Sequence, residues 1–319
     1  KKKMDKITLW EQEEYQYPLS CGFIPNMRLY IHEDDIVRPC ILIAPGGGYC
    51  VVSPSEGEIV AKKFYDMGYQ ADVITYTTNL LMSTPLNKQP MMDLMRAIRY
   101  VRKNEENLKV NQVILCGFSA GAHAVGTVGV HFDEIEDKKY PGISARPDAL
   151  ILSYPVITSG EYAHRDSFNA LLGFSPSQED LNYMSLEKHV SDNTPPCFIW
   201  QTATDELVPV KNSYLFANAL QEHHIPYSLH IFSKGPHGLS LADKTWANEE
   251  FSEPYTLEQT FALMKAVEDD LISLPDEVKQ MLLNQKAMFT GKVEHQKGSV
   301  WDEVKVWPEL ADEWLKGLK

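Results

Sequence analysis

Ser119 lies at the centre of the Gly-x-Ser-x-Gly segment Gly117-Phe118-Ser119-Ala120-Gly121. An apolar run ending at Cys116 precedes it, and a stretch of small residues from 120 to 130 follows it. A serine on a sharp turn between a strand and a helix is a nucleophile elbow, and glycines beside it leave room for the turn. The pattern predicts that Ser119 is a nucleophile that forms an acyl-enzyme ester. The alternative is a chance match to a short motif.

A serine needs a base within hydrogen-bond reach and a carboxylate that orients the base. Asp205 follows the apolar run 197–203, and His237 follows the run 227–232 between Pro236 and Gly238. If these runs are parallel strands, their carboxyl ends meet at one edge of the sheet. The sequence therefore predicts a catalytic triad of Ser119, His237 and Asp205.

Other histidines and acids compete for these roles. His123 lies one helical turn beyond Ser119, which places it behind the elbow and favours a packing role. His223 and His224 end an amphipathic stretch, where the helix dipole explains a cation. Glu206 is the alternative to Asp205 as the orienting acid.

A glycine run, Pro45-Gly46-Gly47-Gly48-Tyr49, follows the apolar run 41–44. Glycine allows backbone amides to approach a substrate oxygen closely, and rigid amides stabilise an oxyanion well. The run lacks the Lys-Ser/Thr continuation of a phosphate-binding loop. We expect the amides of Gly47, Gly48 and Ala120 to form an oxyanion hole. Tyr49 beside them could stack on a sugar ring, and simple packing is the alternative.

Short apolar runs alternate with amphipathic stretches along the chain, which predicts parallel strands joined by crossover helices. We expect one α/β domain over 1–319, with a mostly parallel central sheet flanked by helices and an antiparallel lead-in of two strands. The predicted strands cover 6–10, 27–31, 41–44, 71–76, 112–116, 149–154, 197–203 and 227–232, and the clearest helices cover 91–103, 213–222 and 308–318.

Two segments interrupt this alternation. Residues 155–196 are rich in loops, and a long excursion of this kind is often a lid or a substrate wall. Residues 243–300 contain two helical patterns and form a predicted helical insertion before the last helix. The insertion could wall the substrate pocket, or it could pack on a far edge or a second subunit.

Composition excludes several classes of protein. The net charge of −14, with 30 basic and 44 acidic residues, argues against a nucleic-acid partner. No segment is long and apolar enough to predict a membrane span or a secretory signal. Five cysteines without metal-like spacing indicate a reduced, cytoplasmic protein. We expect no metal and no organic cofactor, and the oligomeric state, including a homo-oligomer, stays open.

Together these segments resemble bacterial α/β-hydrolase esterases of the acetyl esterase and acetylxylan esterase type, which are related to the hormone-sensitive-lipase group and often carry xylanase names. The resemblance rests on 45–49, 117–123, Thr194-Pro195-Pro196, Asp205 with Val208-Pro209, and 237–239. It covers about residues 20–242 and resumes at about 304–318. Pro45 departs from the histidine that hormone-sensitive-lipase relatives carry there, which favours the carbohydrate-esterase branch.

The resemblance implies an α/β-hydrolase fold and a small-molecule ester substrate, with an acetylated sugar or oligosaccharide as first choice. The predicted function is a serine esterase for short-chain acyl esters. A general short-chain carboxylesterase, and an arylformamidase or prolyl-peptidase-like enzyme, are alternatives. A binding protein that keeps the fold without catalysis is the alternative from another class.

Overall fold

One mixed sheet of eight strands forms the centre of the computed structural model, which describes residues 5–289 and 298–318. Its order is β1-β2-β4-β3-β5-β6-β7-β8. The strands are β1 (Asp5–Thr8), β2 (Asn26–Tyr30), β3 (Arg38–Ala44), β4 (Gln70–Thr75), β5 (Val110–Phe118), β6 (Ala149–Ser153), β7 (Cys197–Thr202) and β8 (Tyr227–Phe232).

Strand direction explains how distant loops reach one place. β1 pairs antiparallel with β2, and β2 pairs antiparallel with β4. Every pair from β4 through β3 to β8 is parallel, so the loops after these strands share one rim. The mostly parallel sheet and its antiparallel lead-in confirm the predicted architecture.

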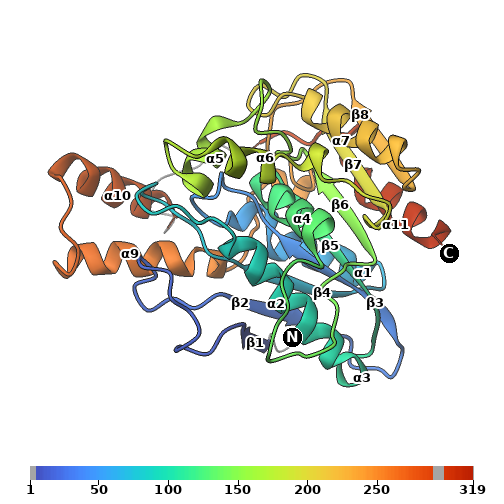
Figure 1. Ribbon diagram of the computed structural model, residues 1–319, viewed down its shortest axis with the longest axis horizontal. Coiled ribbons are helices and arrows are strands. Elements are labelled where there is room, and N and C mark those ends of the chain that lie inside the picture. The colour runs from blue at the N-terminus through green and yellow to red at the C-terminus, as the bar shows by residue number, and fades with distance from the viewer. Residues whose placement is uncertain (1–4, 290–297, 319) are drawn as a thin grey trace.

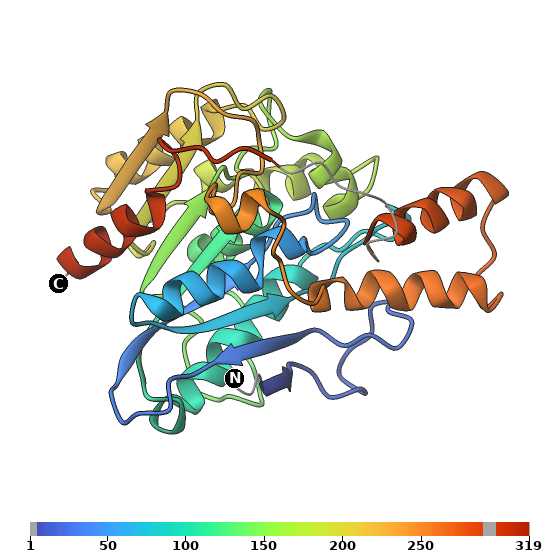
Figure 2. The same cartoon turned by 180° about the vertical axis from the view of Figure 1, so that it is seen from behind.

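Helices cover both faces of the sheet (Figures 1 and 2). The buried side chains of α1 and α11 pack on one face, and those of α2, α4 and α7 pack on the other. Helix α1 was absent from the predicted helices, although its buried residues follow a helical spacing. The helices around the sheet are α1 (Glu58–Asp66), α2 (Gln89–Lys103), α3 (Glu105–Leu108), α4 (Ala120–His131), α7 (Lys211–Glu222) and α11 (Trp307–Gly317).

Both predicted interruptions contain helices. Residues 155–196 contain α5 (Arg165–Leu172), α6 (Gln178–Tyr183) and a 3₁₀ turn, η2 (Leu186–Lys188). Residues 243–300 contain α8 (Lys244–Ala247), the 3₁₀ turn η3 (Tyr255–Leu257), α9 (Glu258–Glu268) and α10 (Asp276–Phe289). Helices α9 and α10 run side by side and extend from one side of the body (Figures 1 and 2). Residues 290–297 of the predicted insertion lie outside the described part.

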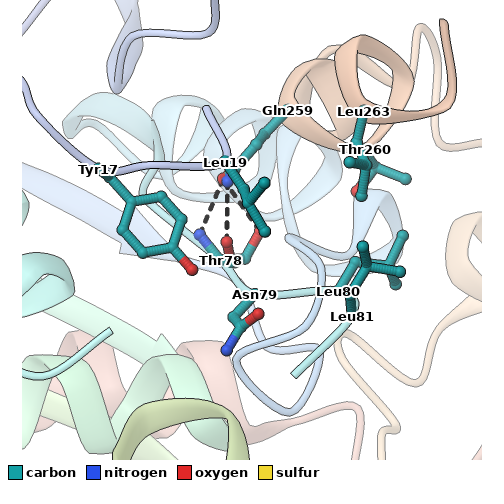
Figure 3. A pocket seen from close by; sticks show the side chains of 9 residues that line it. All are labelled: Tyr17, Leu19, Thr78, Asn79, Leu80, Leu81, Gln259, Thr260 and Leu263. Atoms are coloured by element: carbon teal, nitrogen blue, oxygen red, sulfur yellow. Dashed lines mark hydrogen bonds between the residues drawn. The ribbon is translucent and has the colours of Figure 1, made fainter. Parts of the chain in front are cut away.

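The base of α9 is anchored at the rim. Oγ1 of Thr256 donates to the carbonyl of Val52 at 2.7 Å. The Gln259 side chain accepts from the Thr78 amide and donates to the Thr78 carbonyl, both at 2.8 Å. Figure 3 shows the contacts between Gln259 and Thr78 beside a small cavity of about 10 Å³ that Tyr17 also lines. The insertion therefore contacts the loops that follow β3 and β4.

Three further features bear on the composition-based expectations. All five cysteines are free thiols. Within residues 5–289 and 298–318, no group of three or more His, Cys, Asp or Glu side chains is arranged to hold a metal ion. No helix in the same part of the chain has both the length and the apolar character that crossing a membrane requires.

Candidate active site

Ser119 occupies the predicted sharp turn. Strand β5 ends at Phe118 and helix α4 begins at Ala120, so a single residue joins them. Ser119 has φ 56° and ψ −117°, a backbone conformation that side chains rarely adopt. A Cβ on Gly117 would lie 2.5 Å from Cα of Ala122, and one on Gly121 would lie 2.2 Å from the Ala44 carbonyl oxygen. Both glycines are therefore required by close packing of the turn.

The structure brings the serine and the predicted base together. Oγ of Ser119 lies 2.8 Å from Nε2 of His237, although 118 residues separate them. The opposite ring atom, Nδ1 of His237, lies 2.7 Å from Oδ2 of Asp205. A carboxylate oxygen only accepts, so Nδ1 carries the proton and Nε2 is free to accept from the Ser119 hydroxyl. This arrangement suits transfer of the serine proton to the imidazole.

The Asp205 carboxylate is buried and accepts hydrogen bonds from several donors. Its side chain is 1% exposed, and Oδ1 accepts from the amides of Leu207 and Val208 at 3.0 and 2.9 Å. Burial acts to raise the pKa of Asp205, but the hydrogen bonds from His237 and the two amides outweigh it and lower the pKa below its usual value. The carboxylate form is therefore favoured. The Glu206 carboxylate accepts from the backbone amide of His237 at 3.1 Å, whereas the ring of His237 pairs with Asp205.

The glycine loop lies directly against the elbow. A Cβ on Gly46 would lie 3.1 Å from Cβ of Ser119. Gly47 and Gly48 have φ 135° and 65°, which glycine adopts without strain. The amides of Gly47, Gly48 and Ala120 donate no hydrogen bond within the described part of the chain. The amide of Gly46 is occupied, since it donates to Oε1 of Glu56 at 3.0 Å.

The expected sugar-stacking role of Tyr49 is wrong. The side chain of Tyr49 is 1% exposed, and its hydroxyl bonds Nδ1 of His123 at 2.7 Å. Tyr49 has φ 62°, and its ring packs edge-on against Tyr76 and His123. A ring inside the core cannot stack on a substrate.

His123 has the packing role that the sequence favoured. It is fully buried, and Nε2 bonds the Met184 carbonyl at 2.8 Å. Burial lowers the pKa of His123 to about 4. The other two histidines considered as the base, His223 and His224, follow the end of α7. His223 bonds Asp192 there at 3.0 Å.

The sequence did not reveal Glu56 and Tyr154 as neighbours of the site. Glu56 is 5% exposed, and its two oxygens accept from the Gly46 amide and the Tyr154 hydroxyl. The Tyr154 ring lies edge-on to His237, with centroids 4.8 Å apart. The position of Glu56 soon after the glycine loop was the one sequence signal for its role. Its partner Tyr154 is 98 residues away, so the pair could not be found from the sequence.

Gln201 and His164 were missed as well. Gln201, a fully buried residue of β7, donates to Oδ2 of Asp205 at 3.1 Å. His164 precedes α5, and its ring lies within electrostatic range of His237 and Asp205. Burial lowers the pKa of His164. A glutamine near the end of a mostly apolar strand was the sequence signal for Gln201.

Comparison with known proteins identifies relatives of this chain. A profile of the BD-FAE family matches residues 27–220. The chain is 50% identical over 263 residues to "Endo-1,4-beta-xylanase B" of Butyrivibrio fibrisolvens. That alignment covers 80% of this chain and 41% of the relative, so the chain spans about two fifths of the length of the curated relative.

Two solved structures share the fold. The acetyl ester-xyloside bifunctional hydrolase of Caldicellulosiruptor lactoaceticus has a TM-score of 0.70 and 34% identity over 84% of this chain and 97% of its own. The carboxylesterase Cest-2923 of Lactobacillus plantarum WCFS1 has a TM-score of 0.66 and 21% identity over 99% of this chain and 97% of its own. These similarities confirm the expected α/β-hydrolase fold and the resemblance to esterases, some with xylanase names.

Proposed function

The chain belongs to the BD-FAE family and has the α/β-hydrolase fold, and on this premise we propose that it is a carboxylic ester hydrolase that removes short acyl groups, first of all acetyl, from carbohydrates. The observation that carries the proposal is the hydrogen-bonded line from Ser119 through His237 to Asp205. The acyl group and the carbohydrate follow from the acetyl ester-xyloside hydrolase that is 34% identical to this chain.

The proposed reaction begins when His237 takes the Ser119 proton as Oγ attacks the ester carbonyl. Asp205 holds the imidazole tautomer and stabilises the imidazolium that forms. The free amides of Gly47, Gly48 and Ala120 are the proposed donors to the oxyanion, and one such donor contributes about 2.7–4 kcal/mol to the transition state. The alcohol leaves with the proton from His237. Water then gives a proton to the same imidazole and attacks the acyl carbon, and the carboxylic acid is released as Oγ of Ser119 leaves and takes that proton back.

Two segments are proposed to shape the substrate pocket. His164 of the 155–196 segment interacts electrostatically with His237 and Asp205, which supports a wall beside these two residues. The 243–300 insertion begins at the rim, and Gln259 ties it to Thr78. We propose that it limits how bulky an ester the site accepts. Deleting 250–298 should raise the ratio of kcat/KM for bulky esters over small ones, and an unchanged ratio would exclude this role.

The nucleophile is tested with 4-nitrophenyl acetate. Ser119→Ala should lower kcat/KM by about 10⁴-fold or more. Ser153→Ala is a matched control, because the Ser153 hydroxyl is buried and has no hydrogen-bond partner among the described residues. The control should keep activity within about threefold. Retained activity in Ser119→Ala would overturn the proposed function.

The substrate class is tested by comparing acetylated xylo-oligosaccharides with simple alkyl acetates of equal acyl length. A carbohydrate esterase should show the higher kcat/KM on the oligosaccharides. Equal or lower values would favour the general carboxylesterase, and activity on N-formyl anilides or prolyl peptides would favour the other two alternatives. Absence of turnover on the whole panel would favour a binding protein.

We also propose that the protein works in the cytoplasm. This proposal rests on the five free thiols, because an oxidising compartment promotes disulfides. Fractionation of the source cells should place the protein with cytoplasmic markers. Recovery from the medium would contradict it.

A further inference from the structure

Glu56 is a buried carboxylate that forms no ion pair with a lysine or arginine in the described part of the chain. It ends the 3₁₀ turn η1 (Pro54–Glu56), ten residues after Gly46. Carboxylates are seldom buried, because losing water is costly unless hydrogen bonds replace it. Burial raises the pKa of Glu56, and hydrogen bonds from Tyr154 and the Gly46 amide together with the nearby His237 offset this only in part. Because burying the Glu56 carboxylate is costly, we expect it to have a specific role.

The first contact of Glu56 fixes the start of the glycine loop. Its Oε1 accepts from the Gly46 amide at 3.0 Å, and the Gly46 carbonyl accepts from the Ser53 amide at 2.9 Å. Both backbone groups of Gly46 are therefore held from the η1 side. Because Gly46 packs against Cβ of Ser119, its position also sets how close the next amides, those of Gly47 and Gly48, lie to the nucleophile.

The second contact of Glu56 reaches the histidine loop. Its Oε2 accepts from the hydroxyl of Tyr154, and that hydroxyl accepts from the Ser240 amide at 3.0 Å. Ser240 lies three residues after His237, and Oγ of Ser240 donates to the Ser55 carbonyl at 2.7 Å. One carboxylate thus connects the glycine loop with the loop that carries the base.

Tyr154 is itself held in an unusual conformation. It follows β6 with φ 35°, and its amide donates to the Trp200 carbonyl at 2.7 Å. This backbone places the ring edge-on to His237 and the hydroxyl on Glu56. Strained residues persist where the surrounding structure holds them. Here the strained backbone places the Tyr154 hydroxyl between Glu56 and Ser240.

We propose that Glu56 is a positioning residue for the ester hydrolysis: it holds the glycine loop against the nucleophile elbow and, through Tyr154, in register with the His237 loop. This inference rests on the proposed function. Glu56 contacts no reacting atom and acts through the amides that face the oxyanion. Its loss should therefore weaken transition-state binding and leave ground-state binding nearly unchanged.

The test uses purified full-length variants whose active sites are counted by fluorophosphonate labelling, so that kcat refers to competent serines. Glu56→Ala should lower kcat by about 10–100-fold with KM changed less than about threefold, because small misplacements of catalytic groups are costly. Glu56→Gln keeps an acceptor for the Gly46 amide and should recover most of the loss. Equal losses in the two variants, or kcat within about twofold of the parent in Glu56→Ala, would overturn the proposal.

A trifluoromethyl ketone gives a readout that a purely structural role would not move. Oγ of Ser119 adds to its carbonyl carbon, the serine proton passes to His237, and the carbonyl oxygen becomes an oxyanion facing the glycine loop. Its Kd should weaken in Glu56→Ala by about the same factor as kcat falls. An unchanged Kd would contradict the proposal.

The matched control is a second buried carboxylate–tyrosine pair on the far side of the fold. The Tyr69 hydroxyl donates to Oδ1 of Asp312 on α11 at 2.6 Å, and Tyr69 precedes the amino end of β4, away from the catalytic rim. Asp312→Asn should lower Tm while kcat per labelled site and the ketone Kd stay within about twofold. Matching effects in Glu56→Ala and Asp312→Asn would show a general stability effect and overturn the proposal.

A variant that keeps the glutamate covers the case in which Glu56→Ala does not fold. Tyr154→Phe keeps the ring on His237 and removes only the hydroxyl link, so kcat should fall by about 3–10-fold with KM unchanged. Parent-like kcat in Tyr154→Phe would overturn the proposal. Failure of the parent protein to label at Ser119 would instead overturn the proposed function, whereas normal labelling with parent-like Glu56→Ala kinetics would overturn only this inference.

Discussion

Nε2 of Gln201 donates a 3.1 Å hydrogen bond to Oδ2 of Asp205, the same oxygen that accepts from Nδ1 of His237. Gln201 is held in turn, because its Oε1 accepts from Oγ of Ser213 at 2.6 Å. The orientation of the carboxylate therefore depends on a buried residue of β7 as well as on the loop that carries Asp205.

Replacing Gln201 by leucine should lower kcat per labelled serine by about 10–100-fold. A hydrogen bond to a charged group contributes about 1.5–3 kcal/mol, and each 1.36 kcal/mol of barrier is a tenfold change in rate. The control is Gln70→Leu, because Gln70 is equally buried at the start of β4 and bonds the His32 amide and the Leu108 carbonyl. A drop in the control as large as in Gln201→Leu would assign the effect to lost stability.

The choice between the two neighbouring acids can be tested by amide substitutions. Asp205→Asn should lower kcat by about 10⁴-fold, since an amide at this place favours the wrong imidazole tautomer. Glu206→Gln should lower it by less than about tenfold, because the one hydrogen bond of the Glu206 carboxylate among the described residues is to the His237 backbone amide. Steady-state rates on 4-nitrophenyl acetate compare the two, and the reverse order would give the role to Glu206.

Gly121→Ala should lower the free energy of unfolding by about 2–5 kcal/mol. The added Cβ would lie 2.2 Å from the Ala44 carbonyl oxygen, which forces β3 and α4 apart. Gly317→Ala is the control, because its added Cβ meets no described atom within 4 Å and a substitution at the end of α11 should change stability little. Urea unfolding measures both changes. Similar midpoints for the two variants would contradict the tight contact at the elbow.

The sharp turn at Ser119 and the approach of His237 and Asp205 to it could be predicted because their signals are local. Gly117 and Gly121 flank Ser119 within a strand–turn–helix pattern, and Asp205 and His237 each follow a recognisable strand. Parallel pairing of β5, β7 and their neighbours then brings these strand ends to one rim. The fold was predicted for the same reason, since the strand pattern repeats along the chain.

The support around the triad could not be predicted, because it depends on long-range contacts. Glu56 and Tyr154 form a hydrogen bond although 98 residues separate them in the sequence. No local motif around either residue indicates the other. The prediction for Tyr49 failed because its left-handed backbone turns the ring into the core toward His123. Position beside the glycine loop alone does not reveal that direction.

Asp72 should make stability depend on pH. It lies inside β4 with no exposed surface, and neither carboxylate oxygen has a partner among the described residues. Burial raises the pKa of Asp72 well above its usual value. The unfolded chain releases the proton near the ordinary pKa while the folded chain keeps it, so rising pH favours unfolding by about 1.36 kcal/mol per unit until the folded pKa is reached.

Asp72→Asn removes this dependence. The variant should be more stable than the parent at pH 7, and its advantage should shrink as pH falls toward 4. Asp93→Asn should instead lose stability at pH 7, because Asp93 accepts from Thr77, Gln89 and Trp10. Urea midpoints across pH 4–8 measure both variants, and a constant difference between Asp72→Asn and the parent would contradict the buried titration.

Ser119 is proposed to be an activated nucleophile. A fluorophosphonate reacts with a serine hydroxyl by displacing fluoride, and a serine without a base within reach does not react appreciably. The measurement is peptide mapping by mass spectrometry after labelling, with Ser119→Ala and His237→Ala alongside the parent. We predict a single adduct on Ser119 in the parent, none in Ser119→Ala and at most a trace in His237→Ala. An active parent protein without an adduct at Ser119 would contradict the account.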